Sequence, residues 1–254
     1  MEKIARSNKH ASHVKELLSR KLYSLAEEQA LNALKESPRN LEVMIALAEV
    51  YNEGQDYLAA IDIMGKVLKI TSNKPDFLRM AGMMWSQAGF LDRGLELANQ
   101  FLHASNHAPQ AWQLLSNIYE KNGKVEKARS ALSKIPKTDE FYELTTLIEA
   151  RLLYADKEYD KAIDLVKQYH EWYERTRGSS DSENTEYLVD SWFQIAKVYN
   201  KIGDYDAEWA AAERGHEVAD QKWDHAVHEK EMKGVRELFS SENLRAFAHA
   251  TDPY

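Results

Sequence analysis

The sequence contains no cysteine, and only 5 of its 254 residues are proline and 10 glycine. Without cysteine the chain can form no disulfide, thiolate nucleophile or cysteine-based zinc site, a composition typical of a reducing cytoplasm. The scarcity of proline and glycine disfavours an all-β or loop-rich protein, whereas the abundant Ala, Leu, Glu and Lys favour helices. We therefore expect a mostly helical, cytoplasmic protein.

Dense basic clusters and long apolar runs are also missing. The formal net charge is -8, so phosphate backbones should repel the chain and nucleic acid is not an expected partner. No segment approaches the roughly 18 apolar residues that a membrane-spanning helix needs. The first 18 residues, MEKIARSNKHASHVKELL, lack the apolar core of a signal peptide. We expect no membrane association.

Motifs for catalysis are absent as well. The sequence has no dinucleotide-binding glycine pattern, no Gly-rich loop ending in Gly-Lys-Ser/Thr and no nucleophile elbow. Some histidines are spaced to share a helix face, but a metal site also needs a third ligand. These pairs are His10/His13, His103/His107 and His225/His228. We predict no catalytic residue, no metal and no cofactor.

A period of 34 residues is the strongest positive signal. Units begin at Ser7, Leu41, Pro75 and Pro109, and we number positions within each unit from these residues. Position 8 is mostly small, position 11 is large and position 20 is small. In unit order these residues are Val14, Ala48, Gly82 and Ser116; Leu17, Tyr51, Trp85 and Tyr119; and Ala26, Ala60, Gly94 and Ala128. This alternation suits two antiparallel helices that cross closely.

The pattern resembles the tetratricopeptide repeat, a helix-turn-helix unit of 34 residues. Pro38, Pro75 and Pro109 stand at unit boundaries, where proline ends one helix or begins the next. Gly89, Gly123 and Gly203 stand in the expected turn within a unit, which favours residues tolerant of left-handed backbone angles. The resemblance implies an all-α fold, a right-handed α-solenoid of about six repeats with C-terminal capping helices.

The predicted repeat array covers residues 1–220, with repeats starting near 7, 41, 75, 109, 143 and 189. The fifth carries Thr146 and Glu149 where large apolar groups are expected, so a one-residue shift of register stays open there. The sixth carries Glu208 at its small position. A Gly/Ser/Asp-rich stretch near 177–186 predicts a solvated loop, or alternatively one that folds over a partner. Residues 221–254 are predicted to cap the last repeat.

The resemblance implies that the first helix of each repeat lines a concave groove, with positions 5, 9 and 13 facing it and positions 2 and 12 beside them. Amide and guanidinium groups can bond an extended peptide backbone, and methionine adapts to varied side chains. An ordinary solvated surface is the alternative. The predicted binding residues are Glu49, Asn52, Arg79, Met83, Gln113, Asn117, Lys121, Arg151 and Lys197.

Some tetratricopeptide repeats bind a C-terminal carboxylate through Lys and Asn on successive first helices. The corresponding positions here hold Ala11, Ala46, Asp76 and Met80, which disfavours acidic chaperone tails as ligands. We predict a non-catalytic scaffold that binds a protein or peptide segment in the groove. The identity of that partner, and whether the array pairs with itself, stay open.

A second hypothesis comes from the C-terminal tail. Residues 223–254 resemble the connector of bacterial proteins that fuse tetratricopeptide repeats to a sulfotransferase domain. The chain would then be a substrate-presenting or dimerising arm of a larger enzyme whose catalytic domain lies beyond Tyr254. The gene sequence downstream of Tyr254 would distinguish the two hypotheses.

Overall fold

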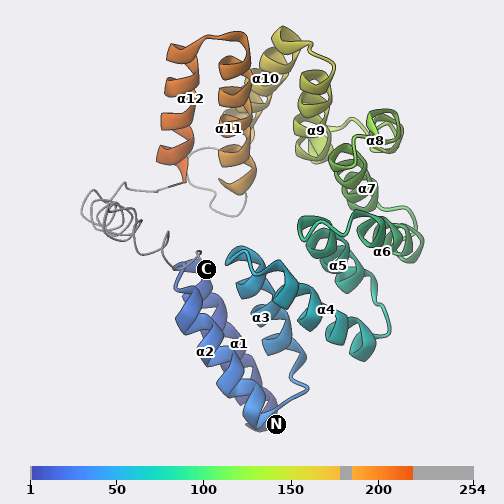
Figure 1. Cartoon of the computed structure of the whole chain (residues 1–254), viewed down its shortest axis with the longest axis vertical. Coiled ribbons are helices and arrows are strands. Elements are labelled where there is room, and N and C mark those ends of the chain that lie inside the picture. Colours follow the sequence, from blue (N-terminus) through green and yellow to red (C-terminus); the bar gives the residue numbers. More distant parts are fainter. Residues whose placement is uncertain (1, 178–184, 220–254) are drawn as a thin grey trace, which may run out of the picture. The chain divides into compact units, whose positions relative to one another are not determined.

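The computed structural model describes residues 2–177 and 185–219. Within these ranges the chain is helical and forms no strand, which confirms the predicted all-α repeat fold (Figure 1). The helices are α1 Glu2–Ser19, α2 Tyr23–Glu36, α3 Leu41–Glu53, α4 Tyr57–Thr71, α5 Pro75–Gln87, α6 Leu91–Ala104, α7 Pro109–Lys121, α8 Val125–Leu132, the 3-10 helix η1 Asp139–Phe141, α9 Tyr142–Ala155, α10 Tyr159–Arg177, α11 Thr185–Ile202 and α12 Tyr205–Val218.

The chain divides into two compact units, Met1–Glu171 and Trp172–Tyr254, and each is described by itself. In the first unit, consecutive helices pair as hairpins, and neighbouring hairpins pack side by side through α2 with α3, α4 with α5 and α6 with α7. No helix in the described ranges is long and apolar enough to cross a membrane. Residues 178–184, in the predicted loop, and 221–254, the predicted capping helices, lie outside the described residues.

The 34-residue period is reproduced by the helix boundaries of the first unit. The second helices of the hairpins begin at Tyr23, Tyr57, Leu91, Val125 and Tyr159. In the fifth repeat α9 begins at Tyr142, directly after η1, yet it ends at Ala155, 34 residues after the end of α7 at Lys121. The register of that repeat therefore does not slip, because the additional residue is accommodated at the start of the helix.

The turn between the two helices of a repeat has a left-handed residue at position 15. Gly89, Gly123 and Gly203 have φ angles of 86°, 67° and 82°, as the sequence predicts. The equivalent positions of the other repeats are left-handed too, although they carry side chains. They are Lys21, Gln55 and Lys157, with φ angles of 57°, 64° and 65°. Repeat geometry therefore outweighs the cost of about 1 kcal/mol that a left-handed non-glycine residue carries.

Small residues lie where the helices of a hairpin cross. Ala48, Ala60 and Ala128 are fully buried, and the Ser116 hydroxyl donates a 2.9 Å hydrogen bond to the Ala128 carbonyl. The fifth repeat follows the same rule with Ala150 and Ala162, both fully buried. Its two polar exceptions are accommodated: Thr146 and Thr145 are buried in α9, while the Glu149 carboxylate lies 3.2 Å from Lys137 Nζ.

The crossing of α5 and α6 is built on two glycines. A Cβ atom on Gly94 would lie 3.2 Å from the Gly82 carbonyl oxygen and 3.3 Å from the backbone nitrogen of Ser86. A Cβ on Gly82 would instead approach the Leu114 Cδ2 atom, at 3.1 Å. Rigid backbone therefore limits position 94, whereas a movable side-chain tip limits position 82.

In the second unit, α11 and α12 pack against each other with a modified crossing. Ala211 and Gly215 are the buried residues of α12, and a Cβ on Gly215 would lie 3.2 Å from the Phe193 ring. Glu208, at the position where a small residue is expected, accepts a 2.8 Å hydrogen bond from Asn200 Nδ2 instead of entering the core. The contact has moved along α12 by about one turn.

One buried histidine has a strongly altered pKa. His170 of α10 is 8% exposed, and its burial lowers the pKa of the imidazole to about 4. The unfolded chain binds a proton at this residue near pH 6.5, whereas the folded chain does so only near pH 4. Folded-state stability is therefore lost as the pH falls from about 6.5 towards 4.

We expect Gly94→Ala to lower the free energy of unfolding by about 2 kcal/mol, because the added methyl group forces two helix backbones apart. Gly82→Ala is the matched control within the same crossing and should cost less than half as much. Urea denaturation of both variants measures the difference. Equal costs for the two substitutions would contradict the asymmetry that the crossing shows.

For His170 we expect the free energy of unfolding to fall by up to about 2 kcal/mol between pH 7 and pH 4.5 through this residue alone. His170→Gln removes the titrating group, so the variant should show a shallower pH dependence even where its stability at pH 7 is lower. Urea titrations of both proteins across this pH range give the two slopes. Parallel slopes would mean that His170 is protonated normally in the folded chain.

Candidate protein-binding surface

Position 9 of successive first helices forms a row of side chains along the first unit. We call it the position-9 row: Lys15, Glu49, Met83, Asn117 and Arg151. Adjacent first helices contact each other, as α1 does α3, α5 does α7 and α7 does α9. Residues 34 apart in sequence thus become neighbours in space. Four of the five members are predicted binding residues.

At the N-terminal end of the row, two members form an ion pair. Lys15 Nζ lies 3.9 Å from Glu49 Oε2. Burial raises the pKa of the Glu49 carboxyl group, and the charge of Lys15 opposes this shift. On the same helix the Asn52 Oδ1 atom is buried and accepts no hydrogen bond from the described part of the chain. Glu49 is therefore held by a cation that the sequence-based prediction left out.

At the C-terminal end, the predicted residues bind each other. Arg151 donates from Nε to Glu120 Oε2 at 2.9 Å and from Nη2 to Asn117 Oδ1 at 2.5 Å. The side chains of Arg151 and Glu120 are 29% and 23% exposed, so water screens the pair only in part. The network fastens α9 to α7, and it engages the guanidinium and amide that we predicted to contact a peptide.

The centre of the surface is different. Arg79 and Met83, one turn apart on α5, are both exposed, and Met83 is 41% exposed. The Arg79 Nη1 atom lies 4.0 Å from the Met83 sulfur, and Arg79 forms no ion pair with any described residue. A guanidinium without a carboxylate beside a flexible thioether thus lies between the two paired ends of the row.

The remaining predicted residues are placed as follows. Gln113 is partly exposed and Lys121 exposed on α7. Lys197 is exposed on α11 in the second unit and is considered separately from the others. Lys15 and Glu120 were not among the predicted binding residues, although the same 34-residue spacing pairs Lys15 with Glu49 and Asn117 with Arg151. Opposite or complementary residues at this spacing are the signal that could have revealed these contacts.

The described residues offer no arrangement for metal chemistry. They contain no group of three or more His, Cys, Asp or Glu side chains that could hold an ion. His103 and His107 do meet, with ring centroids 5.7 Å apart, but the neighbouring ring is that of Trp112 rather than a further ligand. The surface is therefore suited to contacts through hydrogen bonds, charge and apolar packing.

Helical hairpins with a 34-residue period, small residues at the crossings and a left-handed turn residue define a tetratricopeptide-repeat protein. Within that class, the family model of the ChAPs (Chs5p-Arf1p-binding proteins) matches residues 13–151, more than half of the chain. The chain belongs to this family. The matched segment runs from α1 to α9 and contains every member of the position-9 row. Comparison with curated proteins finds no relative.

Solved structures show the same fold. PilF of Pseudomonas aeruginosa has a TM-score of 0.56 at 15% identity, over 91% of this chain and 100% of that one. PilW, a type IV pilus biogenesis factor, has a TM-score of 0.60 at 15% identity, over 85% and 95%. A tetratricopeptide-repeat protein of Thermus thermophilus has a TM-score of 0.56 at 14% identity, over 74% and 98%. At such identities the likeness concerns the fold alone.

We expect Arg151→Ala to lower the free energy of unfolding by about 1–2 kcal/mol, because it leaves the Glu120 carboxylate partly buried without its partner. A double-mutant cycle with Asn117→Ala should give a coupling energy of about 0.5–1 kcal/mol. Lys121→Ala, on the same helix as Asn117 and exposed, serves as the control and should change stability by less than about 0.5 kcal/mol. Strictly additive effects of the two substitutions would show that the contact contributes nothing.

Proposed function

We propose that the protein is a non-catalytic interaction scaffold that binds a segment of another protein across the exposed side of its first helices. The centre of this binding surface is formed by Arg79 and Met83. The observation that carries the proposal is the contrast along the position-9 row: both ends are occupied by intramolecular pairs, while the central guanidinium has no carboxylate partner among the described residues.

Family membership supports a protein partner. The family is named for proteins that bind Chs5p and Arf1p. A repeat array buries its core between hairpins, so the outward-facing positions of its helices are free to vary and to meet a partner. We infer binding of a protein segment on these grounds and leave its identity to experiment.

The chemistry of the central residues indicates what such a segment would offer. Arginine donates several hydrogen bonds in a fixed planar arrangement, which suits a carboxylate or two backbone carbonyls. Methionine is flexible and polarizable and packs against apolar side chains of different shapes. Asn117 and Arg151 would contribute to binding only by giving up their mutual hydrogen bond, so we assign them a smaller role than Arg79.

The wider predictions accompany this proposal. We keep a repeat array over residues 1–220, capping helices over 221–254 and a cytoplasmic protein without cofactor as proposals. The alternative role as an arm of a sulfotransferase rests on residues 223–254, which lie outside the described part of the chain. No described residue favours that alternative, so the scaffold remains the proposed function.

The test uses site-specific photo-crosslinking in the source organism. The photoreactive amino acid p-benzoylphenylalanine is placed at Met83, or as a matched control at Asp62, which is exposed on the second helix α4. We expect a discrete cross-linked protein from position 83 only. Mass spectrometry then maps the linked segment, and isothermal titration calorimetry with that synthetic segment gives its affinity.

With the mapped segment in hand, we expect Arg79→Ala to weaken binding at least tenfold and Arg151→Ala to weaken it less. Lys66→Ala, which removes an exposed cation of α4, should leave the affinity unchanged. Cross-links from position 62 but not from position 83 would place the binding site elsewhere. Unchanged affinity of Arg79→Ala would remove the guanidinium from the site.

A further inference from the structure

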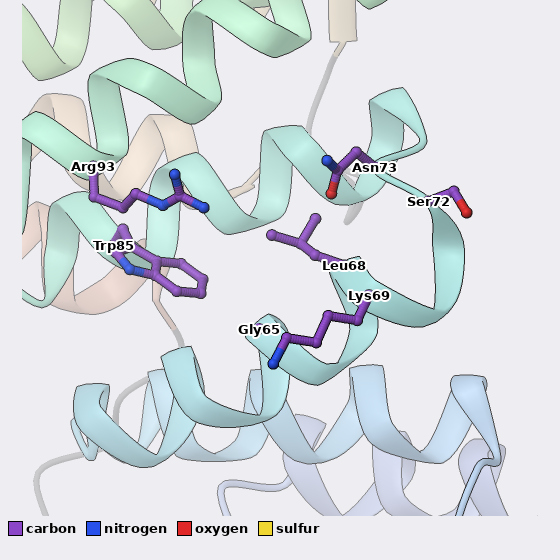
Figure 2. A pocket seen from close by; sticks show the side chains of 7 residues that line it. All are labelled: Gly65, Leu68, Lys69, Ser72, Asn73, Trp85 and Arg93. Atoms are coloured by element: carbon purple, nitrogen blue, oxygen red, sulfur yellow. The ribbon is translucent and has the colours of Figure 1, made fainter.

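A cavity of about 440 Å³ lies where α4 meets α5 and α6, apart from the position-9 row. Leu68 and the indole of Trp85 form its apolar wall, and Lys69 and Arg93 contribute cations (Figure 2). In Figure 2 the Arg93 guanidinium and the Lys69 side chain lie on either side of the indole ring. Its volume is within the range of pockets that accept a ligand or an anchoring side chain.

The cavity exists because residue 65 has no side chain. Gly65 lies in the middle of α4, where glycine costs about 1 kcal/mol relative to alanine. Its φ is not positive, and an added Cβ would meet only the Trp85 Cη2 atom, at an ordinary contact distance of 3.6 Å. Neither a turn nor a close helix crossing requires this glycine. What it does is leave one part of the indole uncovered.

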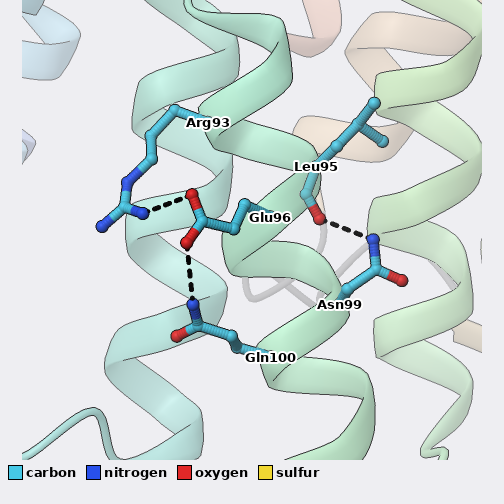
Figure 3. Close-up of polar contacts among 5 residues, drawn as sticks. All are labelled: Arg93, Leu95, Glu96, Asn99 and Gln100. Atoms are coloured by element: carbon cyan, nitrogen blue, oxygen red, sulfur yellow. Dashed lines mark hydrogen bonds and ion pairs between the residues drawn. The ribbon is translucent and has the colours of Figure 1, made fainter.

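The next repeat contains the same arrangement with the space occupied. Asn99 replaces Gly65 34 residues further on, and its side chain donates a 2.8 Å hydrogen bond to the Leu95 carbonyl (Figure 3). There Lys127 Nζ lies 5.9 Å from the centre of the Tyr119 ring, which corresponds to Arg93 beside Trp85. A cation beside an aromatic ring thus recurs between repeats, and at residue 65 the place of a side chain is vacant.

The charges at the cavity are partly uncompensated. Arg93 donates through Nη1 to Glu96, whose other oxygen accepts from Gln100 (Figure 3). Lys69 is exposed and forms no ion pair with any residue in the described ranges. The two cations at the cavity therefore share a single paired carboxylate. This is a local excess of positive charge in a chain whose formal net charge is -8.

We propose that this cavity is a second docking site, which takes an aromatic side chain of a partner protein flanked by acidic residues. The aromatic ring packs on Trp85 in the space beside Gly65, where ring pairs gain attraction beyond apolar burial. The flanking carboxylates pair with Lys69 and Arg93. The site uses no residue of the position-9 row, so its failure would leave the proposed scaffold function untouched.

The probe is the peptide acetyl-Asp-Phe-Asp-amide, titrated into the ¹⁵N-labelled full chain and followed by NMR. We expect saturable shifts of the Gly65 and Lys69 amides and of the Trp85 indole N–H, with a dissociation constant in the millimolar range that suits so small a ligand. Acetyl-Asp-Ala-Asp-amide and acetyl-Lys-Phe-Lys-amide should each bind at least fivefold more weakly. Equal binding of either control peptide would overturn the proposal.

Gly65→Leu tests the site without threatening the fold. Leucine favours a helix more than glycine does, so the melting temperature should stay equal or rise, while the side chain fills the cavity and weakens peptide binding at least tenfold. Asn99→Leu is the matched control one repeat away and should leave binding unchanged. Lys69→Glu should weaken binding at least fivefold.

Two results would overturn the proposal outright. One is undiminished binding to a well-folded Gly65→Leu variant, since the ring would then lie elsewhere. The other is an identical pattern of shifts from inorganic phosphate at the same ionic strength, which would reduce the site to a simple attraction between anions and surface cations.

Discussion

The close approach of two helices within each hairpin is the constraint on which the rest of the structure depends. Two backbones can cross at short range only where the facing residues are small, and alanine, serine or glycine occupies these positions from the second to the fifth repeat. The large residue at position 11 then packs beside the crossing. With this distance fixed, the helices that follow begin at a constant interval, and the hairpins stack in a constant manner.

Constant stacking has a direct effect on the surface. Because residues 34 apart become neighbours, the side chains at one position of the repeat either pair along the array or remain free for a partner. Lys15 and Glu49 pair, as do Asn117 and Arg151, whereas Arg79 and Met83 meet no opposite charge in the described part of the chain. The binding character of the surface is thus decided by neighbours that are distant in sequence.

The sequence predicts the helical fold because the period involves volume and backbone preference, which are local properties. Gly89, Gly123 and Gly203 indicate their turns, but Gln55 and Lys157 give no such sign, since packing alone forces them into the left-handed region. The candidate site is less predictable. All members of the row could be found by spacing, yet the geometry of the Arg151 hydrogen bonds decides which of them stay accessible. The Gly65 cavity depends on a missing side chain, which no motif records.

The strict register between hairpins also bears on how such a chain can change over evolutionary time. Loss of residues 75–108, one full period, would bring α3 and α4 against α7 with every small and large position still matched. Gly65 would then meet Tyr119 in place of Trp85, and Lys127 would stand where Arg93 does. Glu49 would be followed by Asn117, and the exposed Arg79 and Met83 would be gone. A whole repeat can therefore be exchanged while folding is preserved, and the array's choice of company is what such an exchange would alter.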